Sequence, residues 1–265
     1  MLPESFWGRI QYLLQQYGSS FLSGAGNTMI IAIVGTFLGC LIGFIVGIIQ
    51  TIPVDQRDST VKKTLVGILK FIMACYVEFF RGTPMMVQAM FIYYGSAYLF
   101  NINMSMWFAA FFVVSINTGA YMAETVRGGI LSVDEGQTEG AKAIGMTHVQ
   151  TMINVILPQA LRNIMPQIGN NLIINIKDTC VLSIIGIVEL FYTTKGVAGA
   201  YYTYFEAFTI AMVMYFILTF VCSRLLRLLE HKMEGPQNYD LATTDKNLLS
   251  DWDYEQNRIQ PTEVS

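Results

Sequence analysis

One largely apolar segment, residues 163–190, carries several polar side chains close together. Three of them, Asn171, Asn175 and Asp178, are spaced by four and three residues and therefore share one face of a helix. An ionisable side chain at membrane depth is costly, and it usually faces a cavity or the interior of a helix bundle. This face is therefore predicted to contact a polar substrate that passes through the protein.

Lys177 and Thr179 extend this group, and Lys177 lies about 100° around the helix from Asp178. A zwitterionic amino acid could use both charges only if its cavity wrapped around that much of the helix. Adjacent residues pair poorly with each other along one helix, so each charge requires a partner elsewhere. The alternative role for the group is hydrogen bonding to a neighbouring helix or subunit, and the sequence leaves both roles open. Two further candidates, in another apolar segment, are Asn117 and Tyr121.

The sequence gives little support for metal binding or catalysis. The four cysteines are scattered without metal-ligand or redox spacing, and the two histidines, His148 and His231, have no Cys or Glu residues grouped with them. No metal site and no catalytic residue is therefore predicted. Glu189 and Glu206 are expected to be solvated near a membrane interface.

The composition indicates a membrane protein, since 53% of the 265 residues are hydrophobic and only 13% are charged. Soluble domains carry roughly 25% charged residues. The acidic charge is concentrated at the end of the chain, where residues 231–265 hold three basic and seven acidic side chains. Neither this tail nor the remainder suggests binding to nucleic acid.

The apolar stretches predict an all-α integral membrane protein with five transmembrane helices. A helix needs about 20 residues to cross a ~30 Å hydrocarbon core. Leu65 to Phe80 is interrupted by Lys70 and Glu78, so residues 61–81 are predicted as an inner-face helix that leads into the second span. The five predicted spans are residues 29–52, 84–100, 104–126, 163–191 and 203–226.

Glycines recur at every fourth position of the first predicted span, at residues 35, 39, 43 and 47. Small residues at this spacing line one helix face and let a second helix approach closely in lipid. The first span is therefore predicted to pack closely against another helix through this face.

Lysine and arginine cluster in residues 57–81, 127–162 and 224–232, and such clusters mark the cytoplasmic side of a membrane. Five crossings place all three clusters on one side, with the N-terminus outside and the C-terminus in the cytoplasm. The chain is predicted to have three regions: an extracytoplasmic amphipathic segment, 1–20, a transmembrane domain, 21–230, and an acidic cytoplasmic tail, 231–265. The transmembrane domain contains a cytoplasmic loop, 127–162.

The cytoplasmic loop is predicted to be folded. Ser132-x-x-Glu135 matches a capping box, so a helix is expected from about 133 to 144, ended by Gly145 in a left-handed conformation. A second capping box, Thr147-x-x-Gln150, opens a helix that Pro158 interrupts. Two short helices joined by glycine would form a compact projection suited to docking in a groove, and an ordinary structured loop is the alternative.

The same loop resembles the EAA motif of permease subunits in bacterial binding-protein-dependent ABC importers. The matching residues are Glu139-Gly140-Ala141, then Gly145, then Leu157-Pro158, with Gly140 in place of the first alanine and Val155 at the isoleucine position. Residues 76–84, 120–130 and 177–179 are similar to the polar amino acid uptake group of that family. The resemblance covers roughly residues 24–230.

The resemblance implies a type I ABC importer permease that moves a polar amino acid across the bacterial cytoplasmic membrane by alternating access. It implies three kinds of partner: a second permease subunit, identical or paralogous, a cytoplasmic ATPase dimer, and an extracytoplasmic solute-binding protein that docks near 100–104 and 192–203. The chain has no Gly-x-x-x-x-Gly-Lys-Ser/Thr loop, so ATP and Mg are expected on the ATPase and no cofactor in this chain. The residues expected to couple to the ATPase are Glu139, Gly140, Ala141, Gly145, Leu157 and Pro158.

Two other classes of protein remain as alternatives. A secondary transporter or channel would need no ATPase, but such folds often contain inverted repeats, and none is visible here. An intramembrane enzyme would require converging catalytic side chains, for which only Lys177 and Asp178 could begin a case.

Overall fold

The part of the chain that the structure describes is helical and contains no strand, which confirms the all-α prediction. The computed structural model describes residues 2–54 and 59–234, with side chains up to 230. The helices are α1 (Phe6–Thr51), α2 (Thr60–Gly82), α3 (Met85–Phe100), α4 (Met106–Leu131), α5 (Glu135–Ala143), α6 (His148–Thr151), α7 (Leu157–Asp178), α8 (Leu190–Tyr201) and α9 (Tyr204–Glu234). A π-helical turn (Met152–Ile156) precedes α7, and a 3-10 turn (Thr179–Ile185) follows it.

Helix α1 packs closely along α4, and the predicted glycine stripe lies in this contact. A Cβ atom at Gly39 would lie 2.6 Å from Thr118 Cβ, and one at Gly47 would lie 2.7 Å from Val126 Cβ. Both distances are shorter than carbon atoms tolerate, so only glycine permits this approach. The prediction that the glycine face of the first span packs against another helix is confirmed.

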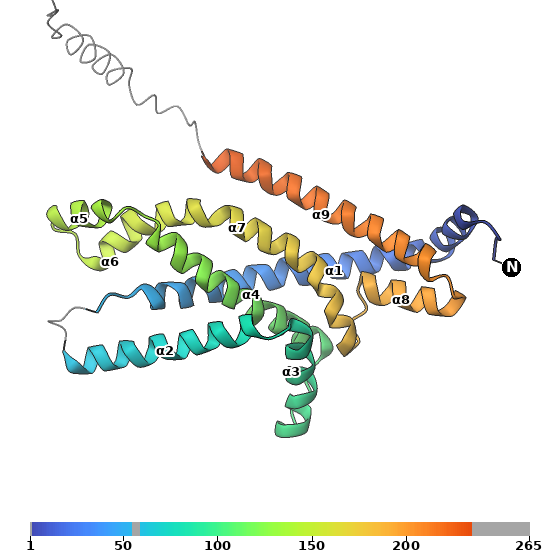
Figure 1. Cartoon of the computed structure of the whole chain (residues 1–265), viewed down its shortest axis with the longest axis horizontal. Coiled ribbons are helices and arrows are strands. Elements are labelled where there is room, and N and C mark those ends of the chain that lie inside the picture. Colours follow the sequence, from blue (N-terminus) through green and yellow to red (C-terminus); the bar gives the residue numbers. More distant parts are fainter. Residues whose placement is uncertain (1, 55–58, 235–265) are drawn as a thin grey trace, which may run out of the picture.

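Three helices of the described chain, α1, α4 and α9, are long and apolar enough to cross a membrane. The run His148–Ile185 and α8 could supply a fourth crossing, since the two are bent by 56° at the break between them. The predicted second span corresponds to α3, whose 16 residues extend only about 24 Å. This is shorter than a hydrocarbon core. A complete second crossing therefore requires α2 as well, which runs beside α1 while α3 turns away from it (Figure 1).

The N-terminal residues form the first turns of α1 and no separate element. Ser5 caps the helix by accepting a hydrogen bond from the amide of Gly8, and the helix then continues to Thr51. Residues 1–20 are predicted as a separate amphipathic segment, and a single helix of 46 residues contains most of this segment together with the first span. The predicted acidic tail lies outside the described residues from 235 onward.

The connection between α4 and α7 forms the short helices α5 and α6 at one end of the molecule (Figure 1). Thr147 and Gln150 make the predicted capping box, and Gly145 has the predicted left-handed conformation, with φ of 83°. The capping box at Ser132 and Glu135 is wrong. Because α4 continues to Leu131, Ser132 is the residue that ends α4, and Asp134 caps α5 by accepting from the amide of Gly136.

The opposite end of the molecule holds the N-terminus and α8 (Figure 1). Glu189 is fully buried there and caps α8, accepting hydrogen bonds from the amides of Phe191 and Tyr192. Its carboxylate also accepts from Thr28 of α1 at 3.5 Å and from Tyr215 of α9 at 2.9 Å. The expectation that Glu189 is solvated is wrong, because three helices close over it.

Glu206 is also buried, with 7% of its surface exposed, so the expectation of a solvated side chain is wrong here too. Its carboxylate forms an ion pair with Arg9 at 3.1 Å, and the Arg9 guanidinium in turn donates to the carbonyl of Pro3. The ion pair fastens the start of α1 to the start of α9.

Candidate functional site

A cavity of about 290 Å³ lies where the break between α2 and α3 meets α4 and α7. Five of the seven predicted substrate-pathway residues line it, two from α4 and three from α7. The lining residues are Thr83, Pro84, Met85, Asn117, Thr118, Tyr121, Asn171, Ile174, Asn175 and Asp178. Residues that are far apart in the sequence therefore surround one polar space.

The face of α7 predicted from the four- and three-residue spacing points into this cavity. Asn171, Asn175 and Asp178 all line it, whereas Lys177 is exposed on the neighbouring face and Thr179 is buried elsewhere. The Thr179 hydroxyl donates to the carbonyl of Ile176 in its own helix. The cavity therefore receives the Asp178 carboxylate without the adjacent ammonium group of Lys177.

The amide groups of the asparagines are largely used within the chain. Asn175 Nδ2 donates to the Thr36 hydroxyl of α1 at 2.7 Å and to the Thr118 hydroxyl of α4 at 2.9 Å. Asn171 Nδ2 donates to the Gln167 carbonyl at 3.0 Å and contacts the sulfur of Met122. These bonds hold α7 against α1 and α4, so the asparagines position the helix that carries Asp178.

Gln88 is a buried residue that the sequence analysis did not single out. Its Nε2 donates to the carbonyls of Phe80 and Thr83, and its Oε1 accepts from Asn117 at 3.0 Å. The unpaired carbonyl groups at the break between α2 and α3 are thereby satisfied. A signal was present, because Gln88 is a strongly polar residue one turn after Thr83-Pro84 in an otherwise apolar segment.

An ion pair between Arg81, in the last turn of α2, and Glu124 of α4 lies next to this cavity. The Arg81 guanidinium also lies 5.5 Å from the centre of the Tyr121 ring, a distance typical of a cation–π contact. Both ionic side chains are partly exposed, at 36% and 49%. The ion pair thus joins the end of α2 to α4 beside the cavity.

The predicted coupling residues occupy the far end of the molecule from α8. Glu139 and Gly140 of α5 are exposed, whereas Ala141 is buried. Leu157 packs on the hydrophobic cluster that joins α4 and α7, and Pro158 is exposed at the second position of α7. The loop is therefore a folded unit in which α5 packs on α6 and the π-helical turn, and Leu157 joins it to the helix bundle.

Large apolar side chains are exposed on the same folded unit. Ile144 is 79% exposed, and Val149 and Ile153 are each more than half exposed. A contiguous exposed apolar surface beside polar residues is typical of a protein interaction site. The arrangement suits docking by another protein.

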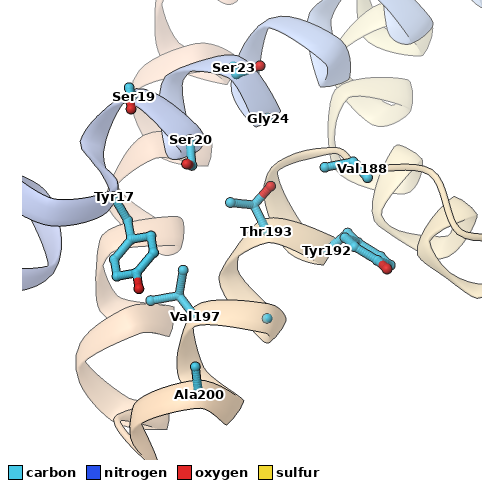
Figure 2. Close-up of a pocket in the computed structure, with 11 residues that line it drawn as sticks. Tyr17, Ser19, Ser20, Ser23, Gly24, Val188, Tyr192, Thr193, Val197 and Ala200 are labelled. Atoms are coloured by element: carbon cyan, nitrogen blue, oxygen red, sulfur yellow. The ribbon is translucent and has the colours of Figure 1, made fainter.

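A second cavity, of about 550 Å³, lies between α1 and α8 (Figure 2). Hydroxyl groups dominate its polar lining, with Tyr17, Ser20 and Ser23 on α1 facing Tyr192 and Thr193 on α8. No charged side chain lines this cavity within the described chain. A zwitterion requires charged partners when it leaves water, so the smaller cavity beside Asp178 is the better candidate for an amino acid.

Comparison with known proteins agrees with these features. Residues 64–235 match the family described as binding-protein-dependent transport system inner membrane component. The glutamine transport system permease protein GlnP of Escherichia coli is 35% identical over 214 residues, which are 80% of this chain and 92% of that protein. The nopaline transport system permease protein NocM of Agrobacterium fabrum is 34% identical over 230 residues, covering 83% and 90%.

Solved structures show the same fold. An amino acid ABC transporter crystallised with histidines matches with a TM-score of 0.72 and 34% identity, covering 83% of this chain and 96% of that one. An inward-facing MetNI methionine ABC transporter matches with a TM-score of 0.65 at 19% identity, covering 80% and 95%. The resemblance seen in the EAA motif is confirmed, and this chain belongs to the family of binding-protein-dependent transport system inner membrane components, as a permease of the amino acid ABC importer type.

Proposed function

We propose that this chain forms the transmembrane path of an ATP-driven importer for a polar amino acid and works by alternating access. The observation that carries the proposal is one continuous helical run, His148–Asp178, that joins the folded loop to the cavity. One end of this run contacts α5, and the other end carries Asp178. Movement of the loop by a partner can therefore change the cavity.

The partners in this proposal are a cytoplasmic ATPase dimer that binds ATP and Mg, a second permease subunit, and an extracytoplasmic solute-binding protein. The exposed surface around Glu139 and Ile144 provides the docking site for the ATPase. ATP and the loaded binding protein would favour different conformations, and this difference in affinity supplies the coupling. The membrane is the bacterial cytoplasmic membrane, and the transported molecule is an amino acid because the relatives carry glutamine and nopaline.

The distribution of basic side chains supports the proposed orientation. Lys142 and the start of α2, with Lys62 and Lys63, belong to the end of the molecule that holds α5, whereas Arg9 and Lys195 belong to the opposite end (Figure 1). The rule that basic residues remain inside then places α5 in the cytoplasm and the N-terminus outside.

A cysteine placed at Gln137 tests this orientation. In a variant without the four natural cysteines, we expect a membrane-impermeant maleimide to leave Gln137→Cys unlabelled in intact spheroplasts and to label it after lysis. Ser20→Cys on α1 is the matched control, because it is exposed at the opposite end and should be labelled before lysis. Labelling of position 137 in intact spheroplasts would remove the ATPase docking site and with it the importer proposal.

Substitution of Asp178 tests the cavity. In proteoliposomes that contain the whole transporter and its binding protein, we expect Asp178→Asn to reduce amino acid uptake about tenfold or more, because a charge-assisted hydrogen bond to an ammonium group is lost. Asn170→Ala, on an exposed face of the same helix, should transport normally. Equal uptake by Asp178→Asn and the parent transporter would exclude Asp178 from the substrate path.

A further inference from the structure

The groups of the cavity that keep unused hydrogen-bonding capacity are few. Asn117, Asn171 and Asn175 donate to other parts of the chain. In contrast, neither the Asp178 carboxylate nor the Tyr121 hydroxyl makes a hydrogen bond or ion pair within residues 2–54 and 59–230. An amino acid in this cavity would thus find the Asp178 carboxylate, the Tyr121 hydroxyl and the amide oxygens of Asn117 and Asn171, whose nitrogen atoms alone are engaged within the described chain.

A zwitterionic amino acid also requires a positive partner for its α-carboxylate. No lysine or arginine lines the cavity in the described part of the chain. Arg81 is a cation in contact with the residues that line the cavity. It precedes the lining residue Thr83 by two positions, and its guanidinium lies over the ring of the lining residue Tyr121. A guanidinium group has five N–H donors in a plane that matches a carboxylate.

The Arg81 side chain is held by one partner only. Its Nη1 pairs with Glu124 Oε2, and its other nitrogens have no hydrogen bond or ion pair to any described residue. Both side chains are partly exposed, so neither is locked inside a packed core. Glu124 lies one helical turn after Tyr121 on α4, so a carboxylate in the cavity and Glu124 can reach the same guanidinium from neighbouring positions.

We propose that Arg81 binds the α-carboxylate of the transported amino acid and that Glu124 competes with this carboxylate for the guanidinium. Asp178 and Tyr121 then face the α-ammonium group. The inference rests on the proposed function and adds the residue that recognises the zwitterion. It also gives Glu124 a defined role. When the substrate carboxylate replaces the Glu124 carboxylate on the Arg81 guanidinium, the ion pair that joins α2 to α4 is lost and the contact between these helices loosens.

Direct binding to the permease–ATPase complex tests the proposal. The complex is placed in lipid nanodiscs without binding protein or nucleotide, and equilibrium binding of radiolabelled L-glutamine is measured, followed by the other proteinogenic L-amino acids if L-glutamine does not bind. The bound amino acid is then compared with its α-carboxamide, for example L-glutaminamide, which keeps the ammonium group and lacks the carboxylate.

The two variants should act in opposite directions. We expect Arg81→Gln to weaken binding of the amino acid about tenfold or more and to abolish its preference over the carboxamide. Glu124→Gln should tighten binding of the amino acid by about threefold, because the competing carboxylate is gone. A purely structural ion pair would make both variants equally harmful, and that result would overturn the proposal.

Two further variants make the result specific. Arg127→Gln removes an exposed arginine one turn beyond Glu124 and should leave binding unchanged. Lys177→Gln tests the neighbouring cation. If Lys177→Gln abolishes the preference for the amino acid over its carboxamide and Arg81→Gln does not, the assignment of the carboxylate to Arg81 is wrong. The cavity would still be the substrate site in that case. If no amino acid binds to the parent complex, the proposed function is contradicted, because the cavity is then not an amino acid site. This outcome differs from a failure of the Arg81 assignment alone.

Discussion

Replacement of Gly43 by leucine is expected to prevent the chain from accumulating as a folded membrane protein. A Cβ atom at this position would lie 2.9 Å from the backbone nitrogen of Ala123 in α4 and even closer to Met122. Backbone atoms cannot move aside as a flexible side chain can, and overpacking typically costs about 1–3 kcal/mol or more. Yield and thermal unfolding of the detergent-purified protein, followed by size-exclusion chromatography, measure the effect.

Gly26 provides the matched control for this prediction. It lies in the same helix, and a Cβ atom there would meet no heavy atom within 4 Å. Gly26→Leu should therefore give a monodisperse protein with the melting temperature of the parent. If Gly43→Leu behaves in the same way, α1 and α4 are not in the contact described above.

Glu139→Lys is expected to abolish transport while membrane insertion continues. Glu139 is exposed on α5 and forms no ion pair with a described residue, so its substitution leaves the permease fold intact. A reversed charge at a docking surface costs several kcal/mol, which corresponds to uptake below about one tenth of the parent level. Uptake by proteoliposomes and co-purification of the ATPase are the two measurements.

Gln137→Lys is the control, because it introduces the same lysine about 200° around α5 from position 139. This variant should retain the ATPase and most of the transport activity. Retention of the ATPase by Glu139→Lys as well would show that the docking surface lies elsewhere than on this face of α5.

Local sequence patterns were sufficient to predict several features. Gly35 to Gly47 mark the α1 face that meets α4, and Gly145 and Thr147 mark the end of one short helix and the start of the next. The spacing of Asn171, Asn175 and Asp178 identified the cavity face of α7. Each of these signals is carried by residues within a few turns of one another, where helical periodicity is reliable.

Other features depend on residues that are distant in the sequence, and no local pattern reveals them. In the sequence, Glu189 resembles a solvated residue at a membrane interface. In the structure it is buried between helices and accepts hydrogen bonds from Thr28 and Tyr215. Contacts between distant helices therefore decide the burial of Glu189.

The buried Glu189 has a consequence for any movement at this end of the molecule. Its carboxylate accepts four hydrogen bonds, from Thr28, Phe191, Tyr192 and Tyr215, so the start of α8 is joined to both α1 and α9. Sliding α8 against either helix would leave a charged group without donors in a dry interior, which is costly. We therefore expect the start of α8 to move together with α1 and α9.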